Sequence, residues 1–462
     1  MWTQRDQLQA YQFLRRRLVS ALVSGDANHP VSPSRRLVIG TAVGLGLALL
    51  VTAAFGIYGL LRPDSGASWR TAGQVVVDKD SGANYVLGKD GRLHPMLNYA
   101  SARLLAGGDG RATDSVSAKS LGDAPRGAPL GIDGAPDSLP AAEELLTGHW
   151  TVCSQQPVGR PAGAKPVATA SIGAKPSGTA IGSTNGILVA DPSGHEYLLA
   201  DGHRFRVTDQ SALVSIGFDR SRPVPVTWSF VDAVPAGTDL APMKVADVGD
   251  TGPLLGGHST LVGQVLRSRG VGDSAYRYYL VRADGVAPLT ETAASLLLNS
   301  AELRDAYPGG TPHALDVSGA DLVRAVLPAG DSDDGYPQRL PRPVNVPLSE
   351  GIAVCATGQH GALTDVMLAT SPATASARPV RVAGGDDRTA DQVWVPPGRG
   401  ALVRSGTTYL ITDQGQRFPV ADEDARKALG YGNVAPIPVP ATVLALFPTG
   451  PVLSGAAAAR VH

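Results

Sequence analysis

The chain has 462 residues, which is enough for more than one structural unit. Its 55 glycines and 36 prolines, together with only 5% aromatic residues, favour many short strands and turns over long helices. The formal net charge of -1 excludes a protein that binds nucleic acid through overall positive charge, so no nucleic-acid partner is predicted.

The first 36 residues form a basic head. They hold six arginines against two aspartates, a net charge of +4, while the rest of the chain carries -5. In TQRDQLQAYQFLRRRLVSALV, Thr3 and Asp6 have the spacing of a capping box, and apolar residues recur at helical spacing around Arg15, Arg16 and Arg17. This pattern predicts an amphipathic helix, which either lies on anionic lipid headgroups or docks on a cytoplasmic or membrane partner.

A long apolar run, Leu37–Leu61, follows the basic head. It has no charged residue over 25 positions, and a helix needs about 20 apolar residues to cross the hydrocarbon core. A cleaved signal peptide is the alternative, but its apolar region spans only about 7–15 residues after a short basic leader. We therefore predict an uncleaved transmembrane helix. Gly40 and Gly44 form a GxxxG pair, which either packs against another helix or reflects the general frequency of small residues in such helices.

The position of the positive charges predicts how the chain is oriented in the membrane. Arg35 and Arg36 directly precede the span, on the same side as the other basic residues of the head. The positive-inside rule places this side in the cytoplasm. In this single-pass plasma-membrane protein we expect a cytoplasmic helix and linker at 1–36, the span at 37–61, an extracytoplasmic domain at 62–455 and a C-terminal tail at 456–462.

Four stretches of the extracytoplasmic part resemble one another. They are YVLGKDGRLHP, YLLADGHRFRV, YLVRADGVAPL and YLITDQGQRFPV, which begin at Tyr85, Tyr197, Tyr279 and Tyr409. Each has a tyrosine, two aliphatic residues and an Asp-Gly or Asp-Gln-Gly turn, which is typical of a β-hairpin. The turn residues are Asp90, Gly91, Asp201, Gly202, Asp284, Gly285, Asp413 and Gly415.

The segments around these hairpins also recur. A strand and a polar turn precede each tyrosine strand, and a short helix follows, with Thr290 and Asp422 placed to begin two of the helices. An apolar segment with Pro and Gly near its end comes next in copies two to four. The hairpins lie near residues 73–105, 186–218, 263–298 and 398–431, and this uneven spacing predicts four related β-rich units separated by insertions, not a solenoid.

The two cysteines, Cys153 and Cys355, lie in the insertions, within HWTVCSQQP and GIAVCATGQ. Both runs are typical of strands, so segments 148–156 and 350–358 are expected to contribute to a central unit. In an oxidising compartment two cysteines indicate one disulfide, and the alternative is two unpaired thiols. A disulfide would close a loop of about 200 residues and stabilise the fold by roughly 5 kcal/mol on the chain-entropy model. The segments Pro157–Thr184 and Ala373–Arg388 have the composition of linkers.

Several motifs, in a fixed order, resemble those of one protein family. They are an Arg-Asp-Gln…Tyr-Gln-Phe-Leu head, a single span, LHPMLNYASARLL, APRGAPLGIDGAPDSLP, HWTVC and LGYGNVAPIPVPATVLALFPTGPVLS. Together they resemble the EccB family, a membrane core component of the actinobacterial type VII (ESX) secretion system, from Arg5 to about Ser454. The resemblance implies assembly with EccC, EccD and EccE, association with the mycosin protease, and contacts between the extracytoplasmic domains of neighbouring copies.

The predicted fold class follows from the residue patterns and the resemblance together. It is mixed α+β and β-rich, and it begins with an N-terminal amphipathic helix and one transmembrane helix. An elongated extracytoplasmic domain follows, in which four related repeats surround a central β-rich domain that contains a disulfide. Trp150, Trp228 and Trp394 are expected in the core rather than at an interface.

Some members of this family are named ATPases, so a nucleotide site is the first chemistry to look for. A P-loop needs GxxxxGK[ST], and the sequence has none. The Gly-Ala-Lys runs at Gly163–Lys165 and Gly173–Lys175 are each followed by proline, which removes an amide donor. We therefore predict no catalytic residue and no cofactor site, and we keep ATP hydrolysis as an alternative.

Metal-binding patterns are equally weak. Nine histidines are scattered without HExxH spacing. Asp331, Asp333 and Asp334 faintly resemble a calcium loop, but Gly335 falls one place early and position twelve is Arg342. We therefore predict a solvated acidic loop and no metal site. The sequence predicts a non-enzymatic structural core subunit that anchors and organises the extracytoplasmic side of a type VII secretion complex, with ATP hydrolysis and cell-wall binding as alternatives.

Overall fold

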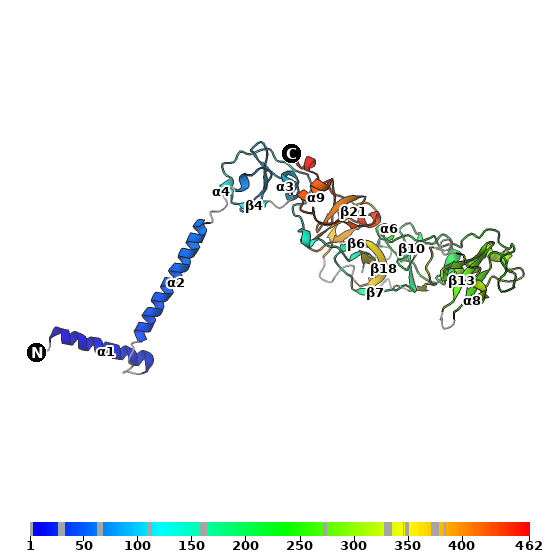
Figure 1. Cartoon of the computed structure of the whole chain (residues 1–462), viewed down its shortest axis with the longest axis horizontal. Coiled ribbons are helices and arrows are strands. Elements are labelled where there is room, and N and C mark those ends of the chain that lie inside the picture. The colour runs from blue at the N-terminus through cyan, green and yellow to red at the C-terminus, as the bar shows by residue number, and fades with distance from the viewer. Residues whose placement is uncertain are drawn as a thin grey trace.

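The computed structural model describes residues 3–25, 33–61, 68–108, 113–157, 164–270, 275–327, 335–344, 346, 351–370, 378–382 and 385–462. Two helices come first, α1 (Gln4–Ser24) and α2 (Pro33–Leu61), and both stand apart from the β-rich remainder of the chain (Figure 1). The carboxylate of Asp6 fixes the start of α1, because it accepts hydrogen bonds from the hydroxyl and the backbone N–H of Thr3, at 2.7 and 3.1 Å. These hydrogen bonds lower the pKa of Asp6.

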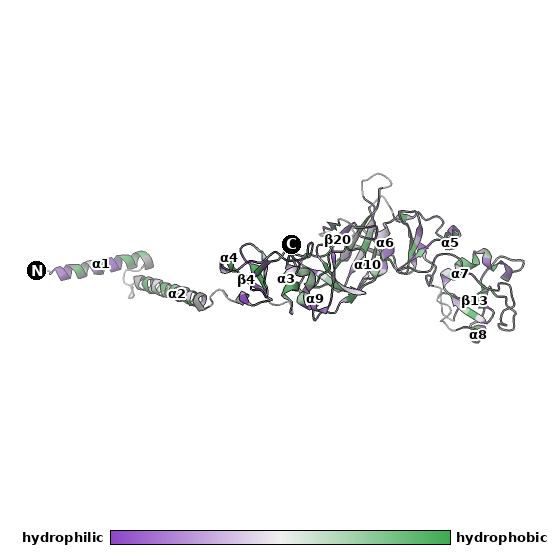
Figure 2. Cartoon of the chain, turned by 90° about the horizontal axis from the view of Figure 1, so that it is seen from above, coloured by the Kyte–Doolittle hydropathy of each residue, from purple (hydrophilic) through white to green (hydrophobic). Residues whose placement is uncertain are grey.

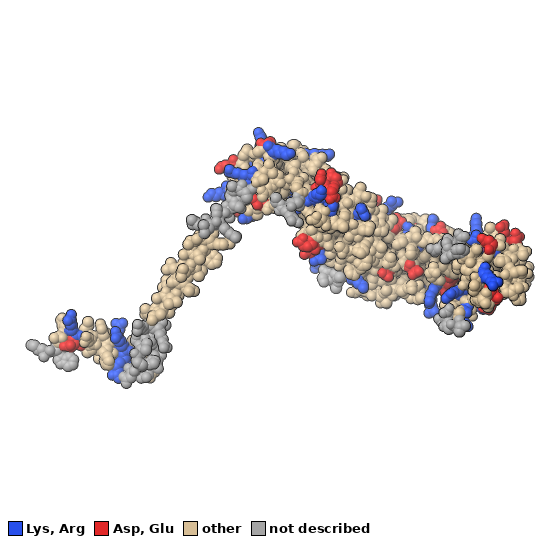
Figure 3. Space-filling model, in the orientation of Figure 1, with Lys and Arg blue, Asp and Glu red and all other residues tan. Residues whose placement is uncertain are grey.

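Helix α2 contains a candidate membrane span, Val38–Tyr58. It is the one helix within the described part of the chain that is long and apolar enough to cross a membrane, and none of it is buried against other residues. Hydrophilic and hydrophobic residues alternate along α1 but not along α2 (Figure 2), and no charged side chain appears along most of α2 (Figure 3). The predicted N-terminal helix and the single candidate span are therefore confirmed.

Four small sheets share one strand order. In each sheet the first three strands form an antiparallel meander and the fourth strand pairs in parallel with the first, which gives the order third, second, first, fourth. With their helices and closing loops we call them unit 1 (residues 75–130), unit 2 (185–240), unit 3 (265–327) and unit 4 (400–453).

The units have the following elements. Unit 1 contains β1 (Val75–Asp78), β2 (Asn84–Leu87), β3 (Leu93–Pro95), α3 (Tyr99–Ala106), β4 (Thr113–Val116) and α4 (Ala118–Leu121). Unit 2 contains β8 (Asn185–Ala190), β9 (Glu196–Ala200), β10 (His203–Arg206), α5 (Gln210–Ser215), β11 (Val224–Pro225) and α6 (Trp228–Ala233). Unit 3 contains β12 (Val265–Ser268), β13 (Arg277–Arg282), β14 (Gly285–Leu289), α7 (Glu291–Leu298), η3 (Ala301–Ala306), β15 (Leu315–Asp316) and α8 (Gly319–Leu322). Unit 4 contains β21 (Gly400–Ser405), β22 (Thr407–Thr412), β23 (Arg417–Val420), α9 (Glu423–Ala428), β24 (Ile437–Pro438) and α10 (Ala441–Leu444).

The tyrosine of each hairpin lies on the second strand of its unit, on β2, β9, β13 and β22. The residue opposite the tyrosine on the third strand is Pro95, Arg206, Pro288 or Pro419. The third strand is an edge of every sheet, and an edge is where a sheet tolerates the missing N–H of proline. The repeated proline therefore follows from the position of the third strand.

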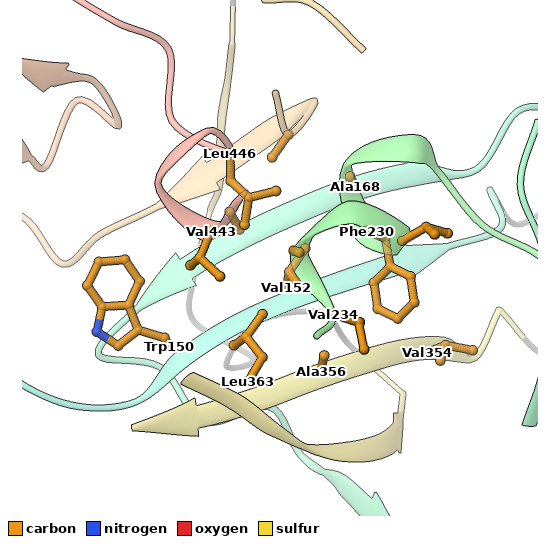
Figure 4. Close-up of a cluster of buried hydrophobic side chains, with 14 of the residues drawn as sticks. Trp150, Val152, Ala168, Phe230, Val234, Val354, Ala356, Leu363, Val443 and Leu446 are labelled. Atoms are coloured by element: carbon orange, nitrogen blue, oxygen red, sulfur yellow. The ribbon is translucent and has the colours of Figure 1, made fainter. Parts of the chain in front are cut away.

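A seven-stranded sheet, which we call the central sheet, lies between units 2 and 4 (Figure 1). Its strands, in spatial order, are β19 (Val380–Arg381), β20 (Gln392–Trp394), β6 (Val167–Ile172), β5 (Trp150–Gln155), β17 (Ala353–Gln359), β18 (Ala362–Ala369) and β7 (Gly178–Ala180). Helices α6 and α10 cover this sheet, with Phe230 of α6 and Val443 of α10 packed beside Val152 (Figure 4). Trp150 is buried in the same core, whereas Trp228 and Trp394 are only partly buried.

The units also pack on one another in pairs. Helix α3 of unit 1 contacts α9 of unit 4, and α5 of unit 2 contacts α7 of unit 3. Each pair shares one hydrophobic cluster, which includes Leu104 and Leu429 in the first pair and Leu213 and Leu296 in the second. Figure 1 shows the resulting order along the molecule: unit 1, unit 4, the central sheet, unit 2 and unit 3.

The remaining elements connect or close these parts. They are η1 (Ser68–Arg70), η2 (Ala142–Glu144), β16 (Arg342–Pro343), which joins the sheet of unit 2 beside β8, and α11 (Gly455–Ala458). Residues 456–462, expected to form a tail, lie against unit 1 instead. Val461 forms a β-bridge with Leu130, and the N–H of His462 donates to the carbonyl oxygen of Pro129 at 3.1 Å.

Two sequence expectations were wrong. The segment Pro157–Thr184 is not a linker, because it contains β6, an interior strand of the central sheet, and β7 at its edge. Small, fully buried side chains such as Ala168 and Ala170 give β6 the composition of a linker, although their size reflects packing in the sheet interior. Likewise Ala373–Arg388 includes β19, while residues 373–377 and 383–384 lie outside the described part of the chain. The fourth strands β4, β11, β15 and β24 were not predicted, because most are only 2 residues long and show no alternation.

Candidate functional site

Helix α1 is the first candidate functional surface. Its large apolar side chains are exposed; they are Leu8, Tyr11, Phe13, Leu14, Leu18 and Leu22. Arg15, Arg16 and Arg17 are exposed on the same helix, and the guanidinium carbon of Arg17 lies 5.7 Å from the centre of the Phe13 ring. A helix with exposed apolar and basic side chains can enter the surface of an anionic bilayer or pack on a helix of another protein.

The small residues of α2 form the second candidate surface. A β-carbon added at Gly40 or at Gly44 would have no other atom within 4 Å, so this face of the helix is open in the single chain. Such a face allows the backbone of another helix to approach closely. The backbone of Arg35 and Arg36 forms part of the first turns of α2, while their side chains lie outside the described part of the structure.

The disulfide Cys153–Cys355 is present, as predicted, with an S–S distance of 2.06 Å. The two cysteines lie directly opposite each other on the neighbouring strands β5 and β17, and both are fully buried. Ala353, Met367 and Ala369 pack around them. The bond joins two strands that are 202 residues apart in the chain, and units 2 and 3 both lie within the loop that it closes.

The glycines of the repeated turns make close contacts. Gly202 has a φ of +71°, and a methyl group there would overlap the carbonyl oxygen of Thr364 on β18. Gly415 has a φ of +77°, and a methyl group there would lie 2.8 Å from Val393 on β20. In units 2 and 4 the turn therefore presses on the central sheet, and only glycine fits both the backbone conformation and the space.

The aspartates of the turns hold local structure. Asp90 accepts a hydrogen bond from the N–H of Arg92 at 3.1 Å and contacts Nε2 of His94 at 3.2 Å, and these contacts lower its pKa. Asp413 accepts from the N–H of Gly398 at 2.8 Å, which ties the turn of unit 4 to the start of its own sheet. These geometries fit a structural role for the turns.

The joint between units 1 and 4 contains polar residues that the sequence did not single out. Nε of Arg103 on α3 donates to the carbonyl oxygen of Ala428 at 3.2 Å. The hydroxyl of Tyr431 donates to the carbonyl oxygen of Pro140 at 2.8 Å, and burial strongly raises the pKa of this phenol. Contacts over some 300 residues of sequence leave no local signal, so only homologues with paired changes would have revealed them.

Several cavities of about 240 to 750 Å³ open on the described residues. One, of about 510 Å³, opens on unit 3 beside Leu280 and Ala287. Another, of about 250 Å³, lies at the end of the central sheet beside His149 and Asp365. In the described ranges no group of three or more His, Cys, Asp or Glu side chains is arranged to hold a metal ion, and Asp331–Asp334 lie outside those ranges.

Comparison with known proteins gives one consistent match. Residues 1–462 match the family described as type VII secretion system ESX-1, transport TM domain B. The chain is 28% identical to the ESX-5 secretion system ATPase EccB5 of Mycobacterium marinum, over 99% of this chain and 93% of that protein. It is 29% identical to the ESX-3 secretion system ATPase EccB3 of Mycolicibacterium smegmatis, over 99% of this chain and 90% of that protein.

Solved structures show the same similarity in three dimensions. The chain superposes on one chain of an intact ESX-5 inner membrane complex with a TM-score of 0.64 and 27% identity, over 100% of this chain and 95% of that one. It superposes on the EccB3 dimer from the ESX-3 core complex with a TM-score of 0.65 and 26% identity, over 84% of this chain and 100% of that one. The second match thus omits a part of this chain that the first includes.

Proposed function

Because this chain belongs to the EccB family of type VII (ESX) secretion proteins, we propose that it is a structural core subunit of an ESX inner membrane complex. The observation that carries this proposal is the full-length match to a chain of an intact ESX-5 inner membrane complex. In this role α2 anchors the subunit in the plasma membrane, and the four units with the central sheet organise the extracytoplasmic side.

The four units are, in our proposal, copies of one ancestral unit arranged around a central domain. Their common strand order, and the tyrosine, turn and edge proline at matching positions, support this relationship. The arrangement produces an elongated extracytoplasmic domain at residues 62–455, with unit 3 at the end far from α2 (Figure 1). An elongated domain of this kind can hold several neighbours at fixed distances.

The proposed partners come from the family resemblance. EccC, EccD, EccE and the mycosin protease would surround this subunit, and α1 and α2 offer an amphipathic surface and an open glycine face toward lipid and other helices. Contacts between extracytoplasmic domains of two copies are supported by the dimer that the related EccB3 forms in the ESX-3 core complex.

Purification of the full chain from native membranes in a mild detergent, followed by mass spectrometry, tests the scaffold role. We expect subunits of the EccC, EccD and EccE families to co-purify. The variant Leu49→Arg/Leu50→Arg puts two charges in the middle of the span and should be lost from the membrane fraction, which gives a matched control. Recovery of the unchanged chain alone, in soluble form, would overturn the proposal.

The orientation has its own test. The described chain has no free cysteine, so an introduced thiol on an exposed residue can be labelled selectively. We expect a membrane-impermeant maleimide to label Arg220→Cys on intact spheroplasts and to label Gln9→Cys only after lysis. The reverse pattern would contradict a cytoplasmic N-terminus.

A second candidate function is ATP hydrolysis, which the printed names of the related EccB5 and EccB3 proteins favour. The sequence has no P-loop, so such an activity would need a different nucleotide site. Hydrolysis that co-elutes with the purified chain through two successive columns, and that a single substitution in one cavity abolishes, would support this function. Activity that separates from the chain would exclude it.

A further inference from the structure

Unit 3 differs from the other units at one position of its third strand. The residue opposite Val86 on β3 is His94, the residue opposite Leu198 on β10 is Phe205, and the residue opposite Leu410 on β23 is Phe418. In unit 3 the residue opposite Leu280 on β14 is Ala287. Three units therefore carry a ring at this position and unit 3 carries a methyl group.

In the three other units the ring lies against a glycine of the closing loop. A methyl group at Gly127, Gly237 or Gly450 would overlap the ring of His94, Phe205 or Phe418. These glycines are equivalent in the three units, because the N–H of each donates to the carbonyl oxygen of the residue just before the ring, at 3.1, 2.9 and 2.9 Å.

In unit 3 the same backbone bond is made by Leu327, whose N–H donates to the carbonyl oxygen of Val286 at 2.9 Å. The pair of large ring and glycine is thus replaced by the pair Ala287 and Leu327. A phenylalanine and a glycine have more side-chain atoms together than an alanine and a leucine, so the exchange removes volume on the face that carries Ala287.

The cavity of about 510 Å³ opens on this face of unit 3. Its apolar part includes Val262, Leu280 and Ala287, which are almost fully buried, and the side chain of Met243 from the connection between units 2 and 3. Four charged residues line it as well; they are Lys244, Asp247, Arg282 and Asp284. Arg282 and Asp284 approach each other to 3.6 Å.

These charges argue against a charged ligand. Two cations and two carboxylates cancel, so the rim attracts neither a nucleotide nor a polyamine strongly. A neutral apolar group flanked by peptide N–H and C=O groups fits an apolar floor with a mixed rim. The fold itself accepts a phenyl ring at the equivalent position of units 2 and 4, where Phe205 and Phe418 are 2% and 0% exposed.

We propose that the cavity of unit 3 binds an aromatic side chain of a partner protein. The ring enters beside Ala287, and the peptide on either side of it contacts the charged rim. Because unit 3 lies at the end of the molecule far from α2, the partner binds at this distal end (Figure 1). The inference depends on the geometry of unit 3 and not on membership of a secretion complex.

Methyl NMR of methionine-labelled full chain in detergent tests the proposal directly. The chain has 4 methionines, and Met243 alone among Met96, Met243 and Met367 lines the cavity. Titration with N-acetyl-L-phenylalaninamide should shift the Met243 methyl signal in a saturable way through the ring current, and should leave Met96 and Met367 unchanged. N-acetyl-L-leucinamide, the matched aliphatic probe, should produce a clearly weaker response. No saturable shift of Met243, or an equal response to both probes, would overturn the proposal.

The variant Ala287→Phe/Leu327→Gly rebuilds in unit 3 the ring and glycine of units 2 and 4. We expect it to shift the Met243 signal without any probe and to abolish the response to N-acetyl-L-phenylalaninamide. Unchanged Met96 and Met367 signals would show that the rest of the variant is folded. A folded variant that still binds the probe would exclude this cavity as the site. If the variant unfolds, the titration of the unchanged chain with the two probes still decides the question.

Discussion

The four units form two halves that look alike but are connected differently. One half is the pair of units 1 and 4, and the other is the pair of units 2 and 3. In each half two units meet through their first helices, α3 with α9 in one and α5 with α7 in the other. Units 1 and 4 come from opposite ends of the β-rich part of the chain, whereas units 2 and 3 follow each other and lie inside the loop closed by the disulfide.

This difference teaches that the same joint can be stabilised in two ways. The half of units 1 and 4 lies outside the loop closed by the disulfide, and a polar bond across a long sequence distance joins it, from Nε of Arg103 to the carbonyl oxygen of Ala428. The half of units 2 and 3 has a short connection, and the disulfide around it stabilises the fold by lowering the conformational entropy of the unfolded chain. Between its helices the hydroxyl of Ser295 donates to the carbonyl oxygen of Ser215 at 2.7 Å. Four perturbations probe this contrast.

Removal of the disulfide should have the largest effect and should act unequally. Cys153→Ala/Cys355→Ala is expected to lower the free energy of unfolding by about 5 kcal/mol, because an open loop of 202 residues has far more conformations when unfolded. Hydrogen exchange measured by mass spectrometry should increase more in units 2 and 3 than in units 1 and 4. An equal increase in both halves would show that they unfold as one cooperative body and would remove the contrast.

Truncation of a buried leucine at each joint should have the next largest effect. Leu296→Ala on α7 and Leu104→Ala on α3 each leave a cavity between two units, since both side chains are almost fully buried. We expect each to lower the free energy of unfolding by about 3 kcal/mol in chemical denaturation.

The two leucine variants control for each other. Leu296→Ala should increase hydrogen exchange in units 2 and 3, and Leu104→Ala should increase it in units 1 and 4. Identical exchange patterns in the two variants would contradict separate joints.

The halves also show what could be read from the sequence. The hairpins were predictable because Asp-Gly turns and the edge prolines are local signals, and the caps at Thr290 and Asp422 were predictable for the same reason. The disulfide followed from having only two cysteines. The span followed from an uncharged run long enough for the bilayer.

What escaped prediction depends on distant parts of the chain. The composition of β6 concealed an interior strand, and the fourth strands were too short to show a pattern. The pairing of unit 1 with unit 4 joins residues such as Arg103 and Ala428, which are 325 positions apart. The cavity of unit 3 does have a local signal, because alignment of the four copies places Ala287 where the others have a ring.

Removal of a single hydroxyl in the half of units 1 and 4 should have a smaller effect on the free energy of unfolding, and this effect should depend on pH. Tyr431→Phe leaves the carbonyl oxygen of Pro140 without its partner and should lower the free energy of unfolding by about 1–2 kcal/mol near neutral pH. Burial raises the pKa of Tyr431 in the folded state, so above its ordinary value near 10 the unfolded chain loses this proton first. The unfolded state then binds fewer protons, and stability falls as pH rises.

The free energy of unfolding of Tyr431→Phe should therefore fall less between neutral pH and about pH 11 than that of the unchanged chain. Chemical denaturation at each pH measures this difference. Tyr307 in unit 3 provides the internal control, because burial raises its pKa as well and its contribution stays in the variant. A variant that loses stability with pH as steeply as the unchanged chain would contradict the assignment to Tyr431.

The helix caps should give the smallest effects and the finest comparison. Asp422 accepts from the N–H of Ala425 at 2.7 Å to begin α9, and Thr290 accepts from the N–H of Ala293 at 3.0 Å to begin α7. Asp422→Ala and Thr290→Ala should each lower the free energy of unfolding by about 1 kcal/mol. Because the two caps lie in different halves, the double variant should lose the sum of the two. A loss in the double variant that differs from the sum of the two single losses by more than about 0.5 kcal/mol would show that the halves are coupled through the central sheet.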